Sequence, residues 1–370
     1  MEYSRLTLLI LAVVLIAGAI YYLDSSDMTA HEATVVELSA TSSPAPDKES
    51  KYPKAKEIVQ PAGFINTEPF KLADLVGKHV ILVDFWTYSC INCQRTMPYL
   101  NDWHQKYSDK GLTIVGMHTP EFAFEKELGN VQAAVAKFGI KYPVVLDNDY
   151  GTWKAYGNRY WPRKYLIDID GYIVYDHIGE GAYEETEQKI QELLAERTEK
   201  LKATTAALPA IGGVPATAPP SAKSPEVYFG ASRNEYLGNG SKDTVGRQTL
   251  IAPETIRPNT LYLVGDWDIQ PEYAESVSSN AKVIFQYEAK EVNVVAEANQ
   301  MRPVFLTQDK VSVSLEAGSD VAGRSSVPDT FFTVSEARLY NLIKNTAAGQ
   351  HVIEFTIPEP GVKLFTFTFG

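Results

Sequence analysis

The pattern of hydrophobic and polar positions begins with an uncharged, apolar run over residues 6–23. A helix of that length reaches about 27 Å at ~1.5 Å per residue, just enough to cross a hydrocarbon core of ~30 Å. Arg5 precedes the run, whereas Asp24 and Asp27 follow it, which predicts a cytoplasmic N-terminus and export of everything else. We therefore expect a transmembrane anchor within residues 1–23. A cleaved signal peptide is the alternative, and it also exports the remaining chain.

Two segments show no apolar periodicity and separate the rest of the chain into units. Residues 24–56 are rich in Ser, Thr, Ala, Pro and charge, which predicts a flexible tether. Residues 201–225 are rich in Ala, Pro and Thr, which is typical of an interdomain linker. Between and after these segments lie residues 57–200 and 226–370. Each of these two units has the length of an ordinary domain.

The first unit alternates strand-like and helix-like stretches, which predicts an α/β layer structure. Strands are expected at residues 80–86, 112–117, 142–146, 165–168 and 172–175, and helices after Cys93 through 99–107, at 130–138 and at 184–196. The last two strands should form a hairpin around the turn Asp170-Gly171.

The second unit is a series of short runs rich in β-branched and aromatic residues, separated by Gly, Pro and Asn. These runs cover residues 261–264, 282–288, 292–296, 304–307, 311–315, 330–334, 351–357 and 364–369. The regular spacing predicts an all-β, jelly-roll-like antiparallel sandwich, with one short helical turn at residues 336–344. Trp267 is either a core residue or an exposed stacking platform.

Charge and cysteine content narrow the function classes. The net charge is -12 and no basic cluster is present, which argues against nucleic acid and against binding of anionic lipid by the folded units. Only two cysteines occur in 370 residues. So few cysteines fit an exported protein that uses its thiols for chemistry and not for structural disulfide bonds. No motif for a cofactor or a metal is found.

Both cysteines stand where the apolar strand at residues 80–86 gives way to a helix, as Cys90-Ile91-Asn92-Cys93. A sulfur at a helix N-terminus meets unpaired N–H groups and the positive end of the helix dipole, which stabilise a thiolate. Cys90 is therefore the expected nucleophile, and Cys93 should resolve the mixed disulfide left on Cys90. The alternatives are a zinc site that recruits two of six scattered histidines, a structural disulfide, and a chance pair of core thiols.

These residues resemble the thioredoxin superfamily. Asp84 lies six residues before Cys90 and Pro98 lies five after Cys93, the offsets of the buried carboxylate and the helix proline in that superfamily. The resemblance implies that Asp84 relays a proton to and from Cys93, because a desolvated carboxylate has a raised pKa. The alternative is an ordinary hydrogen-bonded acid near a strand end. Trp86 is expected to pack beside the dithiol.

Trp161-Pro162 precedes the predicted hairpin strand, where thioredoxin-like proteins keep a cis-proline facing the disulfide. The resemblance implies a site role for Pro162, with Trp86, Ile91, Asn92 and Trp161 contacting the substrate. An ordinary trans proline that opens an edge strand is the alternative.

Longer matches resemble the DipZ family, whose thioredoxin-like part is related to TlpA-like and redoxin proteins. They are FINTEPF at 64–70, WTYSCINC at 86–93, HTPEF at 118–122 and YGNRYWP at 156–162. Three segments of the second unit are similar to the C-terminal domain of that family, which resembles carbohydrate-binding modules. They are Tyr228-Phe229-Gly230, Gly265-Asp266-Trp267 and the closing FTFTFG. The resemblance implies a membrane-associated thiol-disulfide oxidoreductase working outside the cytoplasm. A likeness in fold does not by itself establish sugar binding, so a glycan partner, a partner-docking role and a spacer role are all open for the C-terminal unit.

The sequence leaves several functional hypotheses open. The main one is a reductase of protein disulfides that draws electrons from a separate membrane protein, because this chain has a single predicted span. The reverse, oxidising direction uses the same steps. A redoxin-type peroxidase is an alternative in which His118 and Glu121 polarise the peroxide, although His118 also fits a satisfied strand-end residue. The last alternative is a non-enzymatic surface binder in which the β-rich unit carries the function.

Overall fold

The computed structural model describes residues 48–203, 207–215, 222–322 and 330–370. The predicted anchor and all but the end of the predicted tether lie outside the described residues. None of the described helices combines the length and the apolar character that a membrane crossing requires.

A six-stranded sheet organises the α/β domain at residues 48–201. Its strand order is β1-β4-β3-β2-β5-β6, and β2, β3 and β4 run parallel whereas β1, β5 and β6 run antiparallel to their neighbours. The strands are β1 Gly63–Ile65, β2 Val80–Trp86, β3 Leu112–His118, β4 Val144–Leu146, β5 Arg163–Ile167 and β6 Ile173–Ile178. The helices are α2 Lys48–Lys51, α3 Ile91–Tyr107, α4 Leu128–Lys137, α5 Gly151–Ala155 and α6 Tyr183–Leu201.

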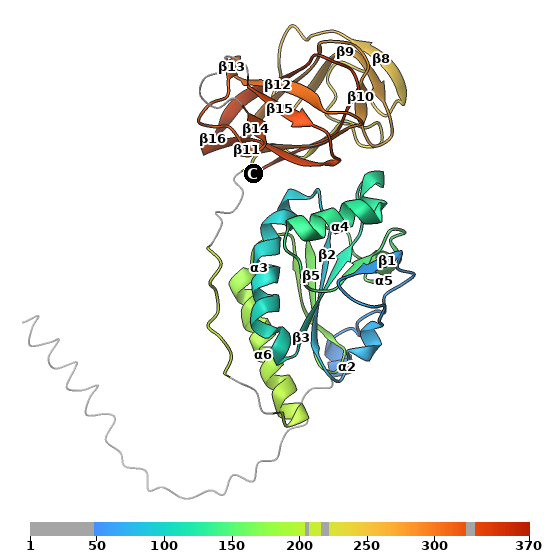
Figure 1. Ribbon diagram of the computed structural model, residues 1–370, viewed down its shortest axis with the longest axis vertical. Coiled ribbons are helices and arrows are strands. Elements are labelled where there is room, and N and C mark those ends of the chain that lie inside the picture. Colours follow the sequence, from blue (N-terminus) through green and yellow to red (C-terminus); the bar gives the residue numbers. More distant parts are fainter. Residues whose placement is uncertain (1–47, 204–206, 216–221, 323–329) are drawn as a thin grey trace, which may run out of the picture. The chain divides into compact units, whose positions relative to one another are not determined.

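Alternation along β2 divides the core of this domain between the two faces of the sheet. Val80, Leu82 and Trp86 pack in one cluster with residues of α3, α4 and α6, and α3 and α6 cover that face in Figure 1. Ile81 and Phe85 pack on the other face, in a second cluster. The even-numbered positions of β2 therefore point toward α3, the helix that begins immediately after Cys90.

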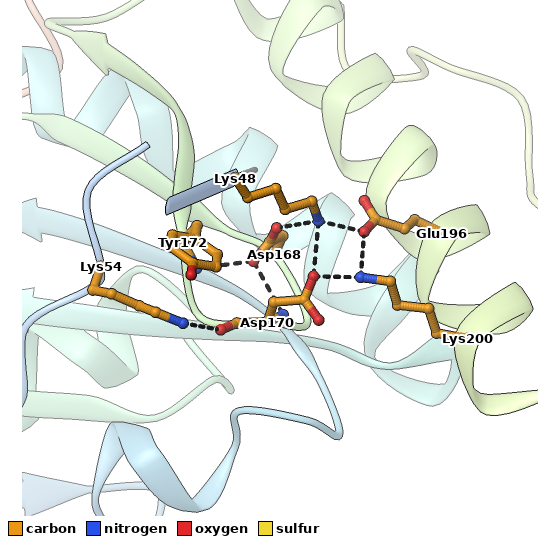
Figure 2. A network of polar contacts seen from close by, with 7 residues as sticks. All are labelled: Lys48, Lys54, Asp168, Asp170, Tyr172, Glu196 and Lys200. Carbon is orange, nitrogen blue, oxygen red and sulfur yellow. Dashed lines mark hydrogen bonds and ion pairs between the residues drawn. The ribbon is translucent and has the colours of Figure 1, made fainter. Parts of the chain in front are cut away.

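A polar network fastens the first described residues to the end of the sheet farthest from Cys90. β5 runs antiparallel to β2, so the turn after β5 lies where β2 begins. Lys48 Nζ donates to Asp168 at 2.6 Å, Asp170 at 2.9 Å and Glu196 at 2.5 Å (Figure 2). Lys200 contacts Asp170 and Glu196 as well. Two ammonium groups thus offset two of the three negative charges of these carboxylates.

Among the acidic, histidine and cysteine side chains of the described ranges, Asp168, Asp170 and Glu196 lie close enough together to bind one metal ion. This group contains neither Cys90 nor Cys93. The zinc alternative for the two cysteines therefore finds no support in the described part of the chain.

The C-terminal domain is β-rich, as predicted. Among its described residues, eleven strands form one hydrogen-bonded sheet with the main order β14-β15-β12-β16-β11-β17-β10-β9-β8. The strands are β7 Val227–Tyr228, β8 Gly246–Leu250, β9 Leu261–Ile269, β10 Ala274–Ser276, β11 Ala281–Ala298, β12 Arg302–Gln308, β13 Val311–Ser312, β14 Val321–Ala322, β15 Phe331–Val334, β16 Arg338–Ile357 and β17 Val362–Phe369. One contiguous hydrophobic cluster forms its core.

Two predictions in this domain were wrong. Residues 338–344 lie in β16 and not in a helical turn, because they pair with β11, as in Val292 opposite Ile343. The runs at 282–288 and 292–296 are one strand with an irregular register, so the polar residues between them do not end it.

Trp267 is fully buried, and its Nε1 donates to the carbonyl of Val264 at 3.1 Å. It is a core residue and offers no stacking platform.

Candidate active site

The two cysteines occupy the first turn of α3 and differ in their access to solvent. Cys90 is the N-cap residue, and its Sγ accepts a hydrogen bond from the backbone N–H of Cys93 at 3.3 Å. Cys90 is partly exposed, whereas Cys93 is fully buried, and both are free cysteines. The N-terminal N–H groups and the helix dipole favour negative charge on the Cys90 sulfur. The positions suit an attacking thiolate at the surface and a second thiol beneath it.

Asp84 lies under this dithiol, on the face of the sheet that carries α3. Its side chain is fully buried, and neither carboxylate oxygen has a hydrogen-bond partner among the described residues. Burial raises the pKa of Asp84 to about 7, and the positive charge of Lys164 opposes that rise. Burial also raises the pKa of the Cys93 thiol, with further contributions from Cys90 and Asp84. A carboxyl that titrates near neutrality can take up and release the Cys93 proton.

Lys164 is a site residue that the sequence reasoning missed. It stands directly opposite Asp84 in the antiparallel pairing of β2 and β5, and its neighbour Leu166 belongs to the α3-side cluster. The side chain is fully buried, and Nζ donates to the carbonyl of Gly179 at 3.1 Å. Burial lowers the pKa of Lys164, although Asp84 and Cys93 both oppose the decrease. A lysine inside an apolar strand, two residues after Pro162, was the available signal.

Glu125 is a second missed residue, and it braces the turn that leads into Cys90. It is fully buried. One oxygen, Oε1, accepts from Ser89 N at 3.1 Å and Ser89 Oγ at 2.7 Å. The other, Oε2, accepts from Glu121 N at 2.6 Å and Phe122 N at 3.0 Å. Burial raises the pKa of Glu125, and the hydrogen bonds from Thr87 and Ser89 oppose the rise. This carboxylate therefore joins the loop after β3 to the turn before α3.

The Trp161-Pro162 peptide is cis. The indole Nε1 of Trp161 donates to the carbonyl of Thr119 at 3.0 Å, and its ring lies 4.3 Å from that of Trp153. Trp161 lines a cavity of about 440 Å³ together with Cys90, Ile91 and Asn92. The structure thus brings three of the four predicted substrate-contacting residues to the same opening as the Cys90 sulfur.

Trp86 does not share that opening, and the prediction that it contacts the substrate needs correction. Its side chain is fully buried, with its ring 4.9 Å from that of His118. It is a packing residue beneath the dithiol.

The two groups considered for a peroxidase differ in their access to the Cys90 sulfur. His118 is fully buried, its Nε2 lies 3.5 Å from Thr87 Oγ1, and burial lowers its pKa to about 3. Glu121 Oε1 accepts from Tyr228 at 2.8 Å and from Arg233 at 2.7 Å. His118 is therefore enclosed in the core, whereas Glu121 lines the cavity at Cys90 with its carboxylate engaged by Tyr228 and Arg233.

Both domains match known protein families. Residues 50–194 match the Redoxin family, and residues 224–370 match the family described as "Thioredoxin like C-terminal domain". Protein DipZ of Mycobacterium bovis is 34% identical over 311 residues, which are 83% of this chain and 41% of DipZ. Thiol-disulfide oxidoreductase YkuV of Bacillus subtilis is 30% identical over 140 residues, which are 38% of this chain and 93% of YkuV. The chain belongs to the thioredoxin-like thiol-disulfide oxidoreductases.

A crystal structure of a DsbE-type thiol:disulfide interchange protein from Chlorobium tepidum shares 28% identity, covers 39% of this chain and 96% of that one, and has a TM-score of 0.35. The match to YkuV has about the length of one domain of this chain, whereas the match to DipZ is too long for one domain. The chain spans less than half the length of DipZ.

Proposed function

We propose that this protein is an extracytoplasmic, membrane-tethered thiol-disulfide oxidoreductase that reduces protein disulfides. The observation that carries the proposal is the placement of a partly exposed Cys90 sulfur at the N-terminus of α3, above a buried Cys93 and a buried Asp84. The family relationship supports the chemistry, and the resemblance to DipZ supports the reducing direction.

The proposed reaction has two steps. The Cys90 thiolate attacks one sulfur of a substrate disulfide, which forms a mixed disulfide and releases the first substrate thiolate. The Asp84 carboxylate then accepts the proton of Cys93, and the Cys93 thiolate attacks the Cys90 sulfur. This step releases the second substrate thiolate and leaves a Cys90–Cys93 disulfide. Pro162 and Trp161 border the site, together with Ile91 and Asn92.

The setting of this reaction is part of the same proposal. Residues 1–23 anchor the chain in the lipid bilayer, residues 24–56 act as a tether, and a separate membrane protein returns two electrons to the disulfide. Residues 57–200 form the redox domain, 201–225 form the linker, and 226–370 fold as a β-sandwich with affinity for a glycan.

A trapping experiment tests the function. The Cys93→Ser variant should accumulate mixed disulfides through Cys90, because the resolving thiol is missing. The variant that lacks both cysteines, Cys90→Ser with Cys93→Ser, is the matched control. Non-reducing electrophoresis of membrane fractions should show adducts with the first variant and none with the second. If both variants give the same result, the dithiol does not carry the function.

A further inference from the structure

The cavity at Cys90 has a second wall that comes from the β-rich domain. Besides Cys90 and Trp161, the side chains of Glu226, Tyr228, Arg233 and others from that domain line the same space of about 440 Å³. A volume of this size is within the range of ordinary ligand sites. A substrate disulfide that reaches the Cys90 sulfur through this cavity must therefore pass residues far away in the sequence.

Polar contacts hold this second wall in place. Arg233 Nη1 and Tyr228 Oη both donate to Glu121 Oε1, at 2.7 and 2.8 Å, and Glu121 belongs to the loop that Glu125 ties to Ser89. The guanidinium of Arg233 also lies 3.6 Å from the centre of the Tyr228 ring.

Apolar contacts also join the α/β domain to the β-rich domain beside this cavity. Phe122 packs in one cluster with Val295, Leu339 and Phe365, and its ring lies 5.1 Å from that of Phe365. Desolvated aromatic contacts of this kind stabilise an interface. The wall is thus fixed beside the dithiol by both kinds of interaction.

The charges differ between the two walls. Arg233 on the β-rich side forms its ion pair with Glu121 of the α/β domain, so Glu226 is an acid of the β-rich side that forms no ion pair with a described residue. On the α/β side, Arg159 is exposed and forms no ion pair with any residue that the structure describes. Glu226 is an exposed residue that lines the cavity. Burial by the walls and the charge of Glu121 raise its pKa to about 7, while Tyr228 and Arg233 oppose the rise.

We infer that the β-rich domain forms part of the substrate site, and that Glu226 selects peptide disulfides that carry a basic side chain beside the cysteine. This inference rests on the proposed oxidoreductase function and names its substrate class. A peptide bound between the walls has its cystine at Cys90 and its flanking side chains within reach of Glu226. A positively charged flank is attracted there, and a negatively charged flank is repelled.

The test compares two short synthetic peptide disulfides that differ only in carrying lysine or glutamate beside the cysteine. The reduced full-length protein is mixed with each peptide at pH 8 and low salt, and the released peptide thiol is measured after acid quenching. We expect the lysine peptide to react faster. Glu226→Lys should change the ratio of the two rate constants about tenfold in favour of the glutamate peptide, and added salt should diminish the change.

Glu254→Lys is the matched control, because Glu254 is an exposed acid of the same domain that does not line the cavity. It alters the net charge equally and should leave the ratio unchanged. Alkylation of Cys90 by iodoacetamide should proceed at the same rate in all three proteins, which separates substrate selection from thiol reactivity.

Two results would overturn the inference: an unchanged ratio in Glu226→Lys, or an equal change in Glu254→Lys. If the wild-type protein reduces neither peptide, nor any protein disulfide, then the proposed function itself fails.

Discussion

Replacing Asp84 with asparagine should stabilise the α/β domain at alkaline pH and leave its stability unchanged at acid pH. Asp84 is fully buried, its oxygens lack hydrogen-bond partners in the described structure, and its pKa rises from an ordinary 3.8 to about 7. The folded state therefore holds the Asp84 proton more tightly than the unfolded state does. In the wild type this contribution to stability is complete below pH 4, falls as the pH rises from about 4 to 7, and is lost above that.

The size of the effect follows from the same two values. One pKa unit corresponds to about 1.4 kcal/mol, so the rise from 3.8 to about 7 corresponds to about 4 kcal/mol at pH 8. Asparagine keeps the shape but never ionises. The gain should be smaller than this limit, about 2 to 4 kcal/mol, because the buried Lys164 loses the neighbouring anion that opposes the decrease of its own pKa.

The assay is urea unfolding of the reduced protein at pH 4, 6 and 8, followed by tryptophan fluorescence. Four of the five tryptophans lie in the α/β domain, so the signal reports chiefly on that domain. Asp109→Asn is the control, because Asp109 is an exposed acid whose side chain is 72% accessible. It should give no pH-dependent gain. An Asp84→Asn gain of equal size at pH 4 and pH 8, or no gain at pH 8, would refute the reasoning.

Three other changes give measurable outcomes. Glu125→Ala removes the acceptor of the hydrogen bonds from Ser89 and Phe122, and should lower the free energy of unfolding by about 3 kcal/mol or more in the same fluorescence assay. A loss below 1 kcal/mol would contradict the bracing role of Glu125. Lys164→Met should raise the pKa of Asp84 and move the pH dependence of mixed-disulfide resolution to higher pH, measured by stopped-flow fluorescence. An unchanged profile would show that Lys164 does not act on the relay. Trp267→Ala should cost about 3 to 5 kcal/mol in the β-rich domain, measured by near-ultraviolet circular dichroism during unfolding, whereas an exposed Trp267 would cost little.

Local patterns in the sequence were sufficient to predict the position of the two cysteines at the start of a helix and the class of each domain. The strand at residues 80–86 coincides with β2, because an unbroken run of apolar and β-branched residues favours a strand buried on both faces. The spacing of Cys90 and Cys93 after that strand places one sulfur at the N-cap of α3 and the other inside its first turn. These features depend on residues that are close together along the chain, so a sequence pattern contains them.

Tertiary structure alone decided the surroundings of the dithiol. Lys164 meets Asp84 because β5 pairs with β2 in one register, and a shift of one residue would move the lysine to the other face of the sheet. Residues 338–344 have a helix-like pattern but form a strand, since pairing with β11 overrides local preference. The contact between Glu121 and Arg233 joins residues 112 positions apart, and no local period encodes such a pairing. The sequence therefore determined which sulfur lies at the helix N-terminus, whereas long-range packing decided which charges surround it.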